Sequence, residues 1–272
     1  MAGTDQFAYE FGFIGMGNMG YAILKGLLHQ YDPQQITFSA RNREKMEDVA
    51  ARTNVQPAAD NRTCAAKARY VVLAVKPQQF DHVIEEIRDV ISEQQIIISI
   101  APGITIASLK ERFGVACRIV RAMPNTPALV GEGMSGVCWQ ESELTAEEKD
   151  TIRGFFQSFG KMELVEEKLM DAVVCASGSS PAYVYLFIEA LADSAVKYGI
   201  PRAAAYELVA QTVLGSARMV LETGEHPGKL KDQVCSPGGT TIAGVAALEE
   251  FGMRNAILKA TDACYEKCTR IK

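Results

Sequence analysis

The first 165 residues alternate short hydrophobic runs with segments in which hydrophobic residues recur at helical spacing. Continuous runs such as Tyr70 to Val75 are typical of strands that are buried on both faces of a parallel sheet. Strands are predicted at 11–14, 35–39, 70–75, 95–100, 117–123, 134–139 and 161–165, with a short extended segment at 54–57. Helices are predicted at 21–28, 43–51, 61–67 and 145–159, where Asn61 caps the third and Thr145 and Glu148 form a capping box on the fourth.

From about residue 166 the pattern changes to alanine-rich segments with the period of a helix. Helices are predicted at 181–198, 201–222, 240–250 and 252–271. Pro181 and Pro201 stand where helices begin, and Gly199 and Gly224 stand where they end. A chain of 272 residues exceeds a typical single core, so two domains are expected, 1–165 and 166–272, the second entirely helical.

Three glycines follow the first strand at the spacing Gly-x-Gly-x-x-Gly. They are Gly15, Gly17 and Gly20, with Met16, Asn18 and Met19 between them. In a strand-turn-helix unit the first glycine permits the turn, the second lets the backbone approach a pyrophosphate, and the third lets helix and strand pack closely. The spacing therefore predicts an α/β N-terminal Rossmann-like domain that binds a dinucleotide, plus an all-α C-terminal domain.

The end of the second strand indicates which dinucleotide is preferred. Sites for NAD usually carry an acidic residue there, but this chain has Ser39, followed by Arg41 and Arg43. A hydroxyl and two guanidinium groups suit a 2′-phosphate, so we expect NADPH, with NADH as the alternative cofactor. In the competing interpretation the two arginines are solvated residues at the start of a helix.

Prolines follow three of the predicted strands. Lys76 and Pro77 come after Val75, Pro102 comes after Ala101, and the last strand leads into Pro124-Asn125-Thr126-Pro127. Because ligands of open parallel sheets bind at the carboxyl ends of the strands, these loops are predicted to form one wall of a cleft.

Two segments of the helical domain are rich in small residues just before a helix. One is Ser177 to Tyr183, and the other is Ser236 to Ile242, which includes Gly238, Gly239, Thr240 and Thr241. Each would present free N–H groups at the positive end of a helix, an arrangement that binds carboxylates. Ordinary capping is the alternative for either one, although the consecutive glycines of the second indicate close approach to a ligand.

Composition excludes several classes of protein. The formal charge of −5 argues against nucleic acid or an anionic membrane as the partner. The seven cysteines form no paired metal-binding spacing and indicate reduced thiols, so no metal is expected. With no leader pattern at residues 1–10 and no hydrophobic run of membrane-spanning length, a soluble, cytoplasmic protein is expected.

Because the predicted loops lack suitable acid or base groups, acid–base and nucleophilic catalysis by the protein are disfavoured. The three histidines, His29, His82 and His226, lie outside the predicted strand-end loops, and no Ser-His-Asp pattern can be assembled. This suits hydride transfer, in which the cofactor carries the chemistry and the protein positions it. The helices after residue 166 are hydrophobic around much of their circumference, which indicates a homodimer through this domain, unless they fill a monomeric core.

Six segments together resemble the pyrroline-5-carboxylate reductase family over nearly the whole length of the chain. They are 15–20, 73–78, 121–128, 180–183, Gln211-Thr212 and 232–249 around Ser-Pro-Gly-Gly-Thr-Thr. The family more often has glycine at the position of Ser180. The resemblance implies reduction of Δ1-pyrroline-5-carboxylate to L-proline with NAD(P)H, and dimers with interlocked helical domains that sometimes form larger rings.

The resemblance also implies the roles of individual residues. The predicted cofactor site comprises the glycine turn together with Ser39, Arg41, Asn61, Ala74, Val75, Lys76, Pro77, Ala101 and Asn125. The predicted substrate site comprises Ser236, Gly239, Thr240 and Thr241, with the Thr241 hydroxyl on the ring nitrogen as the catalytic contact. A protonated imine is already a good hydride acceptor, so no strong acid is required.

Two rival functions share part of this pattern. A β-hydroxyacid dehydrogenase shares the glycine turn but places a lysine early in the first long helix, where this chain has none before Lys197. A sensor that binds NADP(H) without turnover would not need the Gly-Gly-Thr-Thr turn.

Overall fold

The computed structural model describes residues 7–114 and 117–270. They divide into two compact units: one runs to Ser179 and resumes at Cys264, and the other is Ser180–Ala263. Helix α12 (Met253–Thr269) contributes residues to both units. Each unit is described by itself below.

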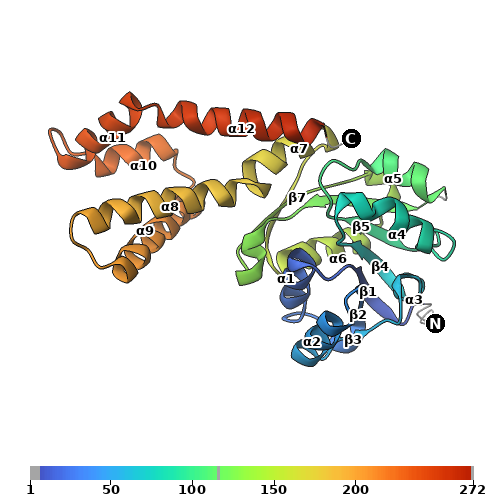
Figure 1. The fold of residues 1–272 in the computed structure, drawn as a ribbon. Coiled ribbons are helices and arrows are strands. Elements are labelled where there is room, and N and C mark those ends of the chain that lie inside the picture. The colour runs from blue at the N-terminus through green and yellow to red at the C-terminus, as the bar shows by residue number, and fades with distance from the viewer. Residues whose placement is uncertain (1–6, 115–116, 271–272) are drawn as a thin grey trace. The chain divides into compact units, whose positions relative to one another are not determined.

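The first unit is built on one sheet of eight strands in the order β3-β2-β1-β4-β5-β6-β7-β8 (Figure 1). The strands are β1 (Tyr9–Ile14), β2 (Ile36–Ser39), β3 (Gln56–Pro57), β4 (Ala68–Leu73), β5 (Ile96–Ser99), β6 (Arg118–Met123), β7 (Gly133–Trp139) and β8 (Gly160–Leu164). All neighbours pair in parallel except β6 and β7, which are antiparallel. The parallel order around β1 brings the carboxyl ends of β1, β2 and β4 to the same edge of the sheet.

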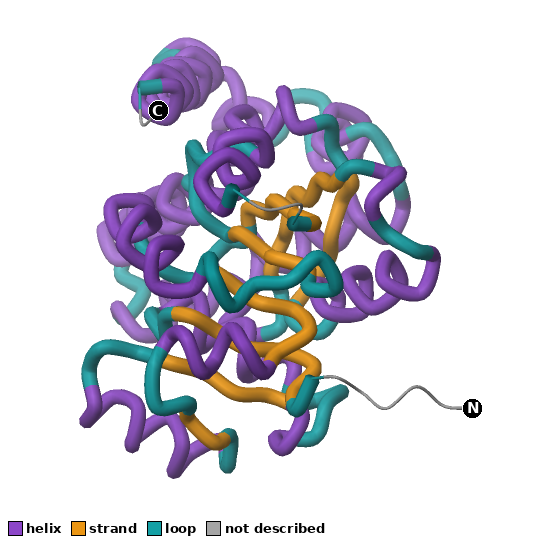
Figure 2. The backbone as a smooth tube through the Cα atoms, turned by 90° about the vertical axis from the view of Figure 1, so that its right-hand side faces the viewer, coloured by secondary structure: helices purple, strands orange, loops and turns teal. Residues whose placement is uncertain are grey.

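Helices cover both faces of this sheet (Figure 2). They are α1 (Asn18–Leu27), α2 (Arg43–Thr53), α3 (Asn61–Lys67), α4 (Phe80–Ile87), α5 (Ile106–Phe113), α6 (Ala146–Gln157) and α7 (Met170–Val173). Short 3₁₀ helices lie at Pro33–Gln35, Pro77–Gln79, Thr126–Val130, Glu141–Glu143 and Glu167–Leu169.

Alternate strand residues pack into two separate cores. In β4, Tyr70 and Val72 belong to the core formed with α1, α2 and α6, whereas Val71 and Leu73 belong to the core formed with α3, α4 and α5. A strand that is buried on both faces has no polar side, which is why its sequence reads as a continuous hydrophobic run. This three-layer arrangement confirms the predicted Rossmann-like α/β domain.

The second unit is helical, and its small core lies between α8 (Ser180–Lys197) and α9 (Arg202–Thr223). It continues through α10 (Pro227–Val234), α11 (Thr240–Glu250) and the first part of α12. Helix α11 is mostly hydrophobic in sequence, yet none of its residues is buried within the chain. Across the described residues, no helix is both long enough and apolar enough to cross a membrane.

The predicted strands and long helices are present, and the capping box of Thr145 and Glu148 is confirmed at the start of α6. The last predicted helix was drawn to Ile271, which lies outside the described residues. Helices α4, α5, α7 and α10 were not predicted from the sequence. Helix α7 has four residues and the other three have eight each, so each offers at most little more than two turns from which to recognise a period.

Candidate functional site

The glycine turn joins β1 to α1, and two of its positions require glycine: one has a positive φ and the other lies against a backbone carbonyl. Gly15 has φ +95°, a conformation that side chains other than hydrogen disfavour, and its N–H donates to the carbonyl of Ser39 at 2.9 Å. A Cβ atom on Gly20 would lie 2.7 Å from the carbonyl oxygen of Gly15. The first and third glycines are therefore required by the turn and by the packing of α1 against it.

Gly17 meets a different requirement, because no described atom lies within 4 Å of the position its Cβ would take. It is the N-cap of α1, and it has no side chain to bond the N–H groups of the first turn. Those groups, with the positive end of the helix dipole, are open to an anion. The turn thus has the open space and the donors that a pyrophosphate needs.

A cavity of about 510 Å³ adjoins the turn. Its walls are formed mainly by the segments that follow β1, β2 and β4 and by α4. The lining residues are Gly15, Met16, Gly17, Ala40, Arg41, Asn42, Lys45, Asn61, Ala74, Val75, Lys76, Gln78, Gln79, His82, Val83 and Glu86. A second cavity, of about 410 Å³, shares Ala40, Arg41, Asn61 and Glu86 with it and adds Ser39. The two cavities extend along the carboxyl edge of the sheet, where dinucleotides bind in this fold.

The structure brings most of the predicted cofactor residues to these cavities. Gly15, Met16, Gly17, Arg41, Asn61, Ala74, Val75 and Lys76 line the larger one, and Ser39 lines the smaller one. Asn18, Met19, Gly20, Pro77, Ala101 and Asn125 line neither. Their predicted contacts with a cofactor stay predictions.

Asn125 and Ala101 have structural surroundings of their own. The Asn125 amide donates to the carbonyl of Ser177 at 3.0 Å and accepts from the Met134 N–H at 2.8 Å. These bonds hold the loop after β6 against two other segments of the same unit. Ala101 is buried after β5.

The two arginines after β2 differ in their surroundings. Arg41 lines both cavities, and no described carboxylate is within ion-pair distance of its guanidinium. Arg43 has a side chain that is 91% exposed and forms an ion pair with Glu47 at 3.2 Å, one turn along α2. Arg43 lines neither cavity, so a role beside a 2′-phosphate is supported for Arg41 alone.

The predicted cap of α3 was wrong by one residue. Asp60, not Asn61, is the N-cap, and its carboxylate accepts from the Thr63 N–H at 2.6 Å. Hydrogen bonds from Thr63 are the main cause that holds the pKa of Asp60 below its ordinary value. Because Asp60 caps the helix, the Asn61 side chain is available to the cavity.

Several residues that line the larger cavity were not predicted from the sequence, among them Gln78, Gln79, His82 and Glu86. All four come from the 3₁₀ turn after Lys76 and from α4, the helix that was not identified. The only signal in the sequence was their position just after a strand-end proline.

The Ser236–Ile242 segment lies in the second unit and opens α11. Gly238 has φ +68°, and Gly239 is the N-cap with no side chain to bond the first turn. Ser236, Thr240 and Thr241 are exposed around it. This is an open helix N-terminus with three hydroxyls beside it, as predicted for carboxylate binding.

The other small-residue segment is not a turn, and that prediction was wrong. Residues 174–178 form a π-helix between α7 and α8, and the Ser179 N–H donates to the Val174 carbonyl at 2.7 Å. The helix is nearly continuous there, so its N–H groups are occupied. A Cβ on Gly178 would lie 2.7 Å from the terminal methyl group of Met123, which would have to shift to make room for it.

The cysteines do not form an additional site. All seven are free, and burial raises the pKa of Cys64, below the glycine turn, to about 12. A thiol with such a pKa is unreactive at neutral pH. Among the described residues, no group of three or more His, Cys, Asp or Glu side chains is arranged to hold a metal ion.

The fold and the cavity define the class of dinucleotide-dependent oxidoreductases, and residues 10–103 match a family model described as "NADP oxidoreductase coenzyme F420-dependent". Residues 167–271 match a second model, described as "Pyrroline-5-carboxylate reductase dimerisation". The pyrroline-5-carboxylate reductase of Escherichia coli (strain K12) is 45% identical over 264 residues, covering 96% of this chain and 98% of that protein. The chain belongs to the pyrroline-5-carboxylate reductase family.

Two solved structures of pyrroline carboxylate reductases are similar to this fold over nearly the whole chain. That of a pyrroline-5-carboxylate reductase from Coxiella burnetii has a TM-score of 0.90 at 37% identity, covering 97% of this chain and 99% of that one. That of Plasmodium falciparum pyrroline carboxylate reductase, with NADP bound, has a TM-score of 0.87 at 33% identity, covering 97% and 98%. The predicted family and the predicted two-part fold are confirmed.

Proposed function

We propose that this protein reduces Δ1-pyrroline-5-carboxylate to L-proline with NAD(P)H, the last step of proline biosynthesis. The observation that supports this most strongly is the near-complete match to reductases of this family, which extends through the glycine turn and the Gly-Gly-Thr-Thr turn. Neither rival function explains both turns. A β-hydroxyacid dehydrogenase needs an early lysine in its first long helix, and a sensor has no need of the second turn.

The cofactor site is proposed to be the two cavities along the sheet edge. Gly17 and the first turn of α1 would hold the pyrophosphate, because that helix end is open and uncapped by a side chain. Arg41, with Lys45 close by, would provide positive charge for a 2′-phosphate. Ala74, Val75 and Lys76 would lie along the nicotinamide half; Pro77, Ala101 and Asn125 are proposed to support them from the neighbouring strand ends.

The substrate site is proposed to be the N-terminus of α11. The N–H groups of Thr240 and Thr241 in the first turn of α11, together with the Ser236 hydroxyl, would bind the substrate carboxylate, without placing a charged side chain beside the cationic imine. The Thr241 hydroxyl would accept from the protonated ring nitrogen and orient the ring.

The reduction needs positioning more than acid or base catalysis. When bound, NAD(P)H supplies a hydride to the carbon of the C=N bond, and the electron pair of that bond passes to nitrogen. Because the nitrogen is already protonated, the product amine forms without a proton from the protein. Thr241 and the α11 N-terminus therefore act by holding the ring in a reactive geometry, which accounts for much of the catalysis in such a step.

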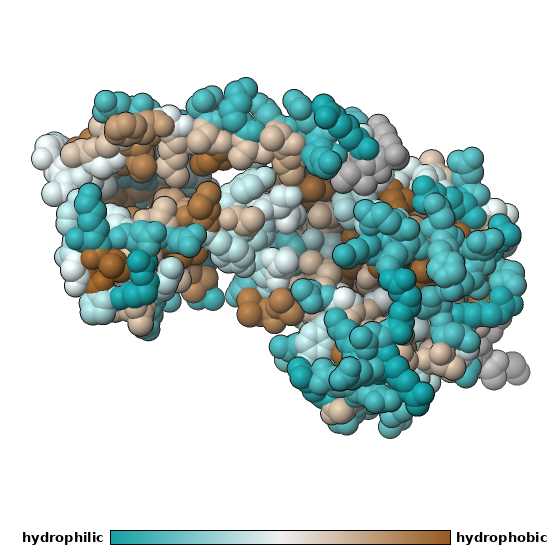
Figure 3. Space-filling model, in the orientation of Figure 1, coloured by the Kyte–Doolittle hydropathy of each residue, from teal (hydrophilic) through white to brown (hydrophobic). Residues whose placement is uncertain are grey.

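Residues 1–165 are proposed to be the cofactor-binding domain and residues 166–272 the dimerisation and substrate domain. The family model for dimerisation begins at 167, close to this boundary, while the contacts within the chain divide it at Ser179. Hydrophobic surface among α8 to α12 is visible in Figure 3. A homo-oligomer through this domain, in the cytoplasm and without nucleic acid or membrane partners, is proposed.

The test is cofactor oxidation, followed by absorbance, with purified protein and pyrroline-5-carboxylate, run in parallel with NADPH and NADH. Rapid turnover that needs both substrate and reduced cofactor is expected. No turnover in protein that binds NADPH would contradict the reductase assignment and favour the sensor.

A further inference from the structure

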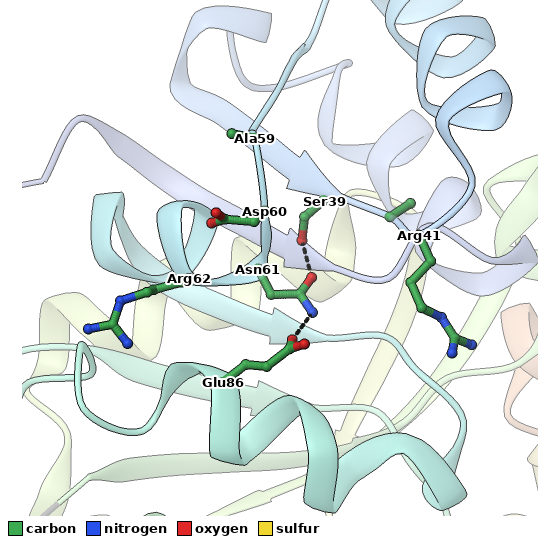
Figure 4. Close-up of a pocket in the computed structure, with 8 residues that line it drawn as sticks. Ser39, Arg41, Ala59, Asp60, Asn61, Arg62 and Glu86 are labelled. Atoms are coloured by element: carbon green, nitrogen blue, oxygen red, sulfur yellow. Dashed lines mark hydrogen bonds between the residues drawn. The ribbon is translucent and has the colours of Figure 1, made fainter.

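Three side chains from three different elements form a hydrogen-bonded chain in the smaller cavity. Ser39 at the end of β2 donates from Oγ to Asn61 Oδ1 at 2.7 Å, and Asn61 Nδ2 donates to Glu86 Oε2 at 2.5 Å. Figure 4 shows the three side chains pointing toward one another, with Arg41 to one side. Glu86 comes from α4, so its place in this chain was not foreseen from the sequence.

Glu86 determines the direction of both hydrogen bonds. An ionised carboxylate only accepts hydrogen bonds, so the amide nitrogen of Asn61 must face it. The amide oxygen then faces Ser39, and the Ser39 hydroxyl donates its single hydrogen to that oxygen at 2.7 Å, since its other acceptor, the Phe13 carbonyl, is more distant at 3.5 Å. Toward a ligand in the cavity, Ser39 Oγ is left with lone pairs only.

This arrangement distinguishes a ribose 2′-hydroxyl from a 2′-phosphate. A hydroxyl can donate to the lone pairs of Ser39, whereas an ionised phosphate presents acceptor oxygens and cannot. The carboxylate also adds a negative charge to the wall of the cavity, where it repels a phosphate more than a hydroxyl.

Arg41 acts in the opposite direction on the same ligand group. It lines both cavities, as Glu86 does, and no described carboxylate pairs with it. Among the described residues, no lysine or arginine lies within ion-pair distance of Glu86; His82, one turn earlier on α4, has its Nε2 3.1 Å from Glu86 Oε1. The cavities thus hold cations that attract a 2′-phosphate, Arg41 and Lys45, and a carboxylate, Glu86, that disfavours it.

We propose that Glu86 is a specificity-determining residue: by orienting Asn61 and Ser39 and by its own charge, it lowers the preference for NADPH and maintains the use of NADH. This inference rests on the proposed cofactor site. It assigns to α4 the discriminating role that an acidic residue at the end of β2 has in NAD-specific proteins of this fold.

The experiment compares Glu86→Gln with the unaltered full-length protein by calorimetric titration of NADPH, NADH, adenosine 2′,5′-diphosphate and AMP. The last two differ only in the 2′-phosphate, so their comparison isolates this group. Glutamine keeps the shape of the side chain but has no charge, and it leaves the Asn61 amide free to turn. Glu85→Gln is the matched control, because it removes the same charge from the neighbouring, exposed position of α4, which lines neither cavity.

In Glu86→Gln the ratio of NADPH to NADH affinity is expected to rise by about fivefold or more. The ratio of adenosine 2′,5′-diphosphate to AMP affinity should rise in parallel. Glu85→Gln is expected to change neither ratio. Glu86→Ala should shift the ratios in the same direction, and melting curves check that each variant is folded. Unchanged or reduced ratios in folded Glu86 variants would overturn the proposal while leaving the cofactor site intact. Failure of the unaltered protein to bind either dinucleotide would instead remove the cofactor site itself.

Discussion

At the scale of single residues, the surroundings of each side chain distinguish residues that look alike in the sequence. Arg41 and Arg43 are two residues apart and identical in type, yet only Arg41 lines the cavities, because Arg43 pairs with Glu47 on the outer side of α2. Asn61 was foreseen as a cofactor residue and also as a helix cap. Since Asp60 provides the cap, the amide is available for Ser39 and Glu86.

Replacing Arg41 with alanine is expected to weaken NADPH binding by about tenfold and NADH binding by no more than about twofold, because a guanidinium bonds a phosphate much more strongly than a hydroxyl. Arg43→Ala should change both affinities by less than about twofold. Titration of each variant with the two cofactors measures this. Equal losses for NADPH and NADH in Arg41→Ala would refute the contact with a 2′-phosphate.

Replacing Thr241 with alanine is expected to lower kcat by about tenfold or more while NADPH affinity stays within about twofold, since the hydroxyl is proposed to orient the imine and not the cofactor. Thr241→Ser retains the hydroxyl and should keep most of the activity. Steady-state kinetics and cofactor titration together measure this. Unchanged kinetics in Thr241→Ala would remove Thr241 from the mechanism.

At the scale of elements, the strand-turn-helix unit of β1 and α1 shows what a sequence pattern predicts and what it leaves undecided. The three glycines have the same identity in the sequence, but their surroundings separate their functions: Gly15 allows a positive φ, Gly20 avoids a backbone carbonyl, and Gly17 leaves open space. The long helices were recognised because their period extends over many residues, and the buried strands because they are continuous hydrophobic runs. Helices α4 and α5 were missed because eight residues carry too short a pattern.

The glycines of this unit are expected to respond differently to substitution. Gly17→Ala should leave the free energy of unfolding within about 1 kcal/mol, because the added methyl group meets no described atom, yet weaken NADPH binding by more than about tenfold. Gly20→Ala should destabilise the fold by about 1–3 kcal/mol, because its Cβ would meet a backbone oxygen. Denaturant unfolding and cofactor titration separate the two effects; a strongly destabilised Gly17→Ala would contradict this division of roles.

At the scale of the whole molecule, the hydrophobic surface of the helical unit indicates assembly. Helix α11 has no buried residue, and large hydrophobic side chains on α8 and α9, such as Leu186, Leu208 and Leu221, are more than half exposed. Monomeric proteins rarely leave so much connected hydrophobic surface in water. The small core between α8 and α9 does not use these side chains, so the alternative of a well-filled monomeric bundle is disfavoured.

Leu186→Glu is expected to shift the protein toward monomer, because Leu186 lines a mostly apolar groove with Tyr185, Ile188, Tyr206 and Glu189, and burying a second carboxylate beside Glu189 would be costly. Leu186→Met keeps the volume and should retain the oligomer. Sedimentation at several concentrations measures the change. If Leu186→Glu sediments as the unaltered protein does, this groove lies outside the interface.

The sequence by itself determined the α/β and helical division, the positions of the buried strands along the chain, the glycine turn and the open N-terminus of α11. These features follow from local patterns: a strand buried on both faces must be hydrophobic throughout, and a tight turn beside a phosphate must be glycine. Only the tertiary structure decided that Arg41 and not Arg43 lines the cavity, that Val174–Gly178 is a π-helix leading to α8, and that Asn61 bonds both Ser39 and Glu86. Those features depend on side chains that are up to 47 positions apart in the chain, and a local sequence pattern does not show that such side chains lie close together.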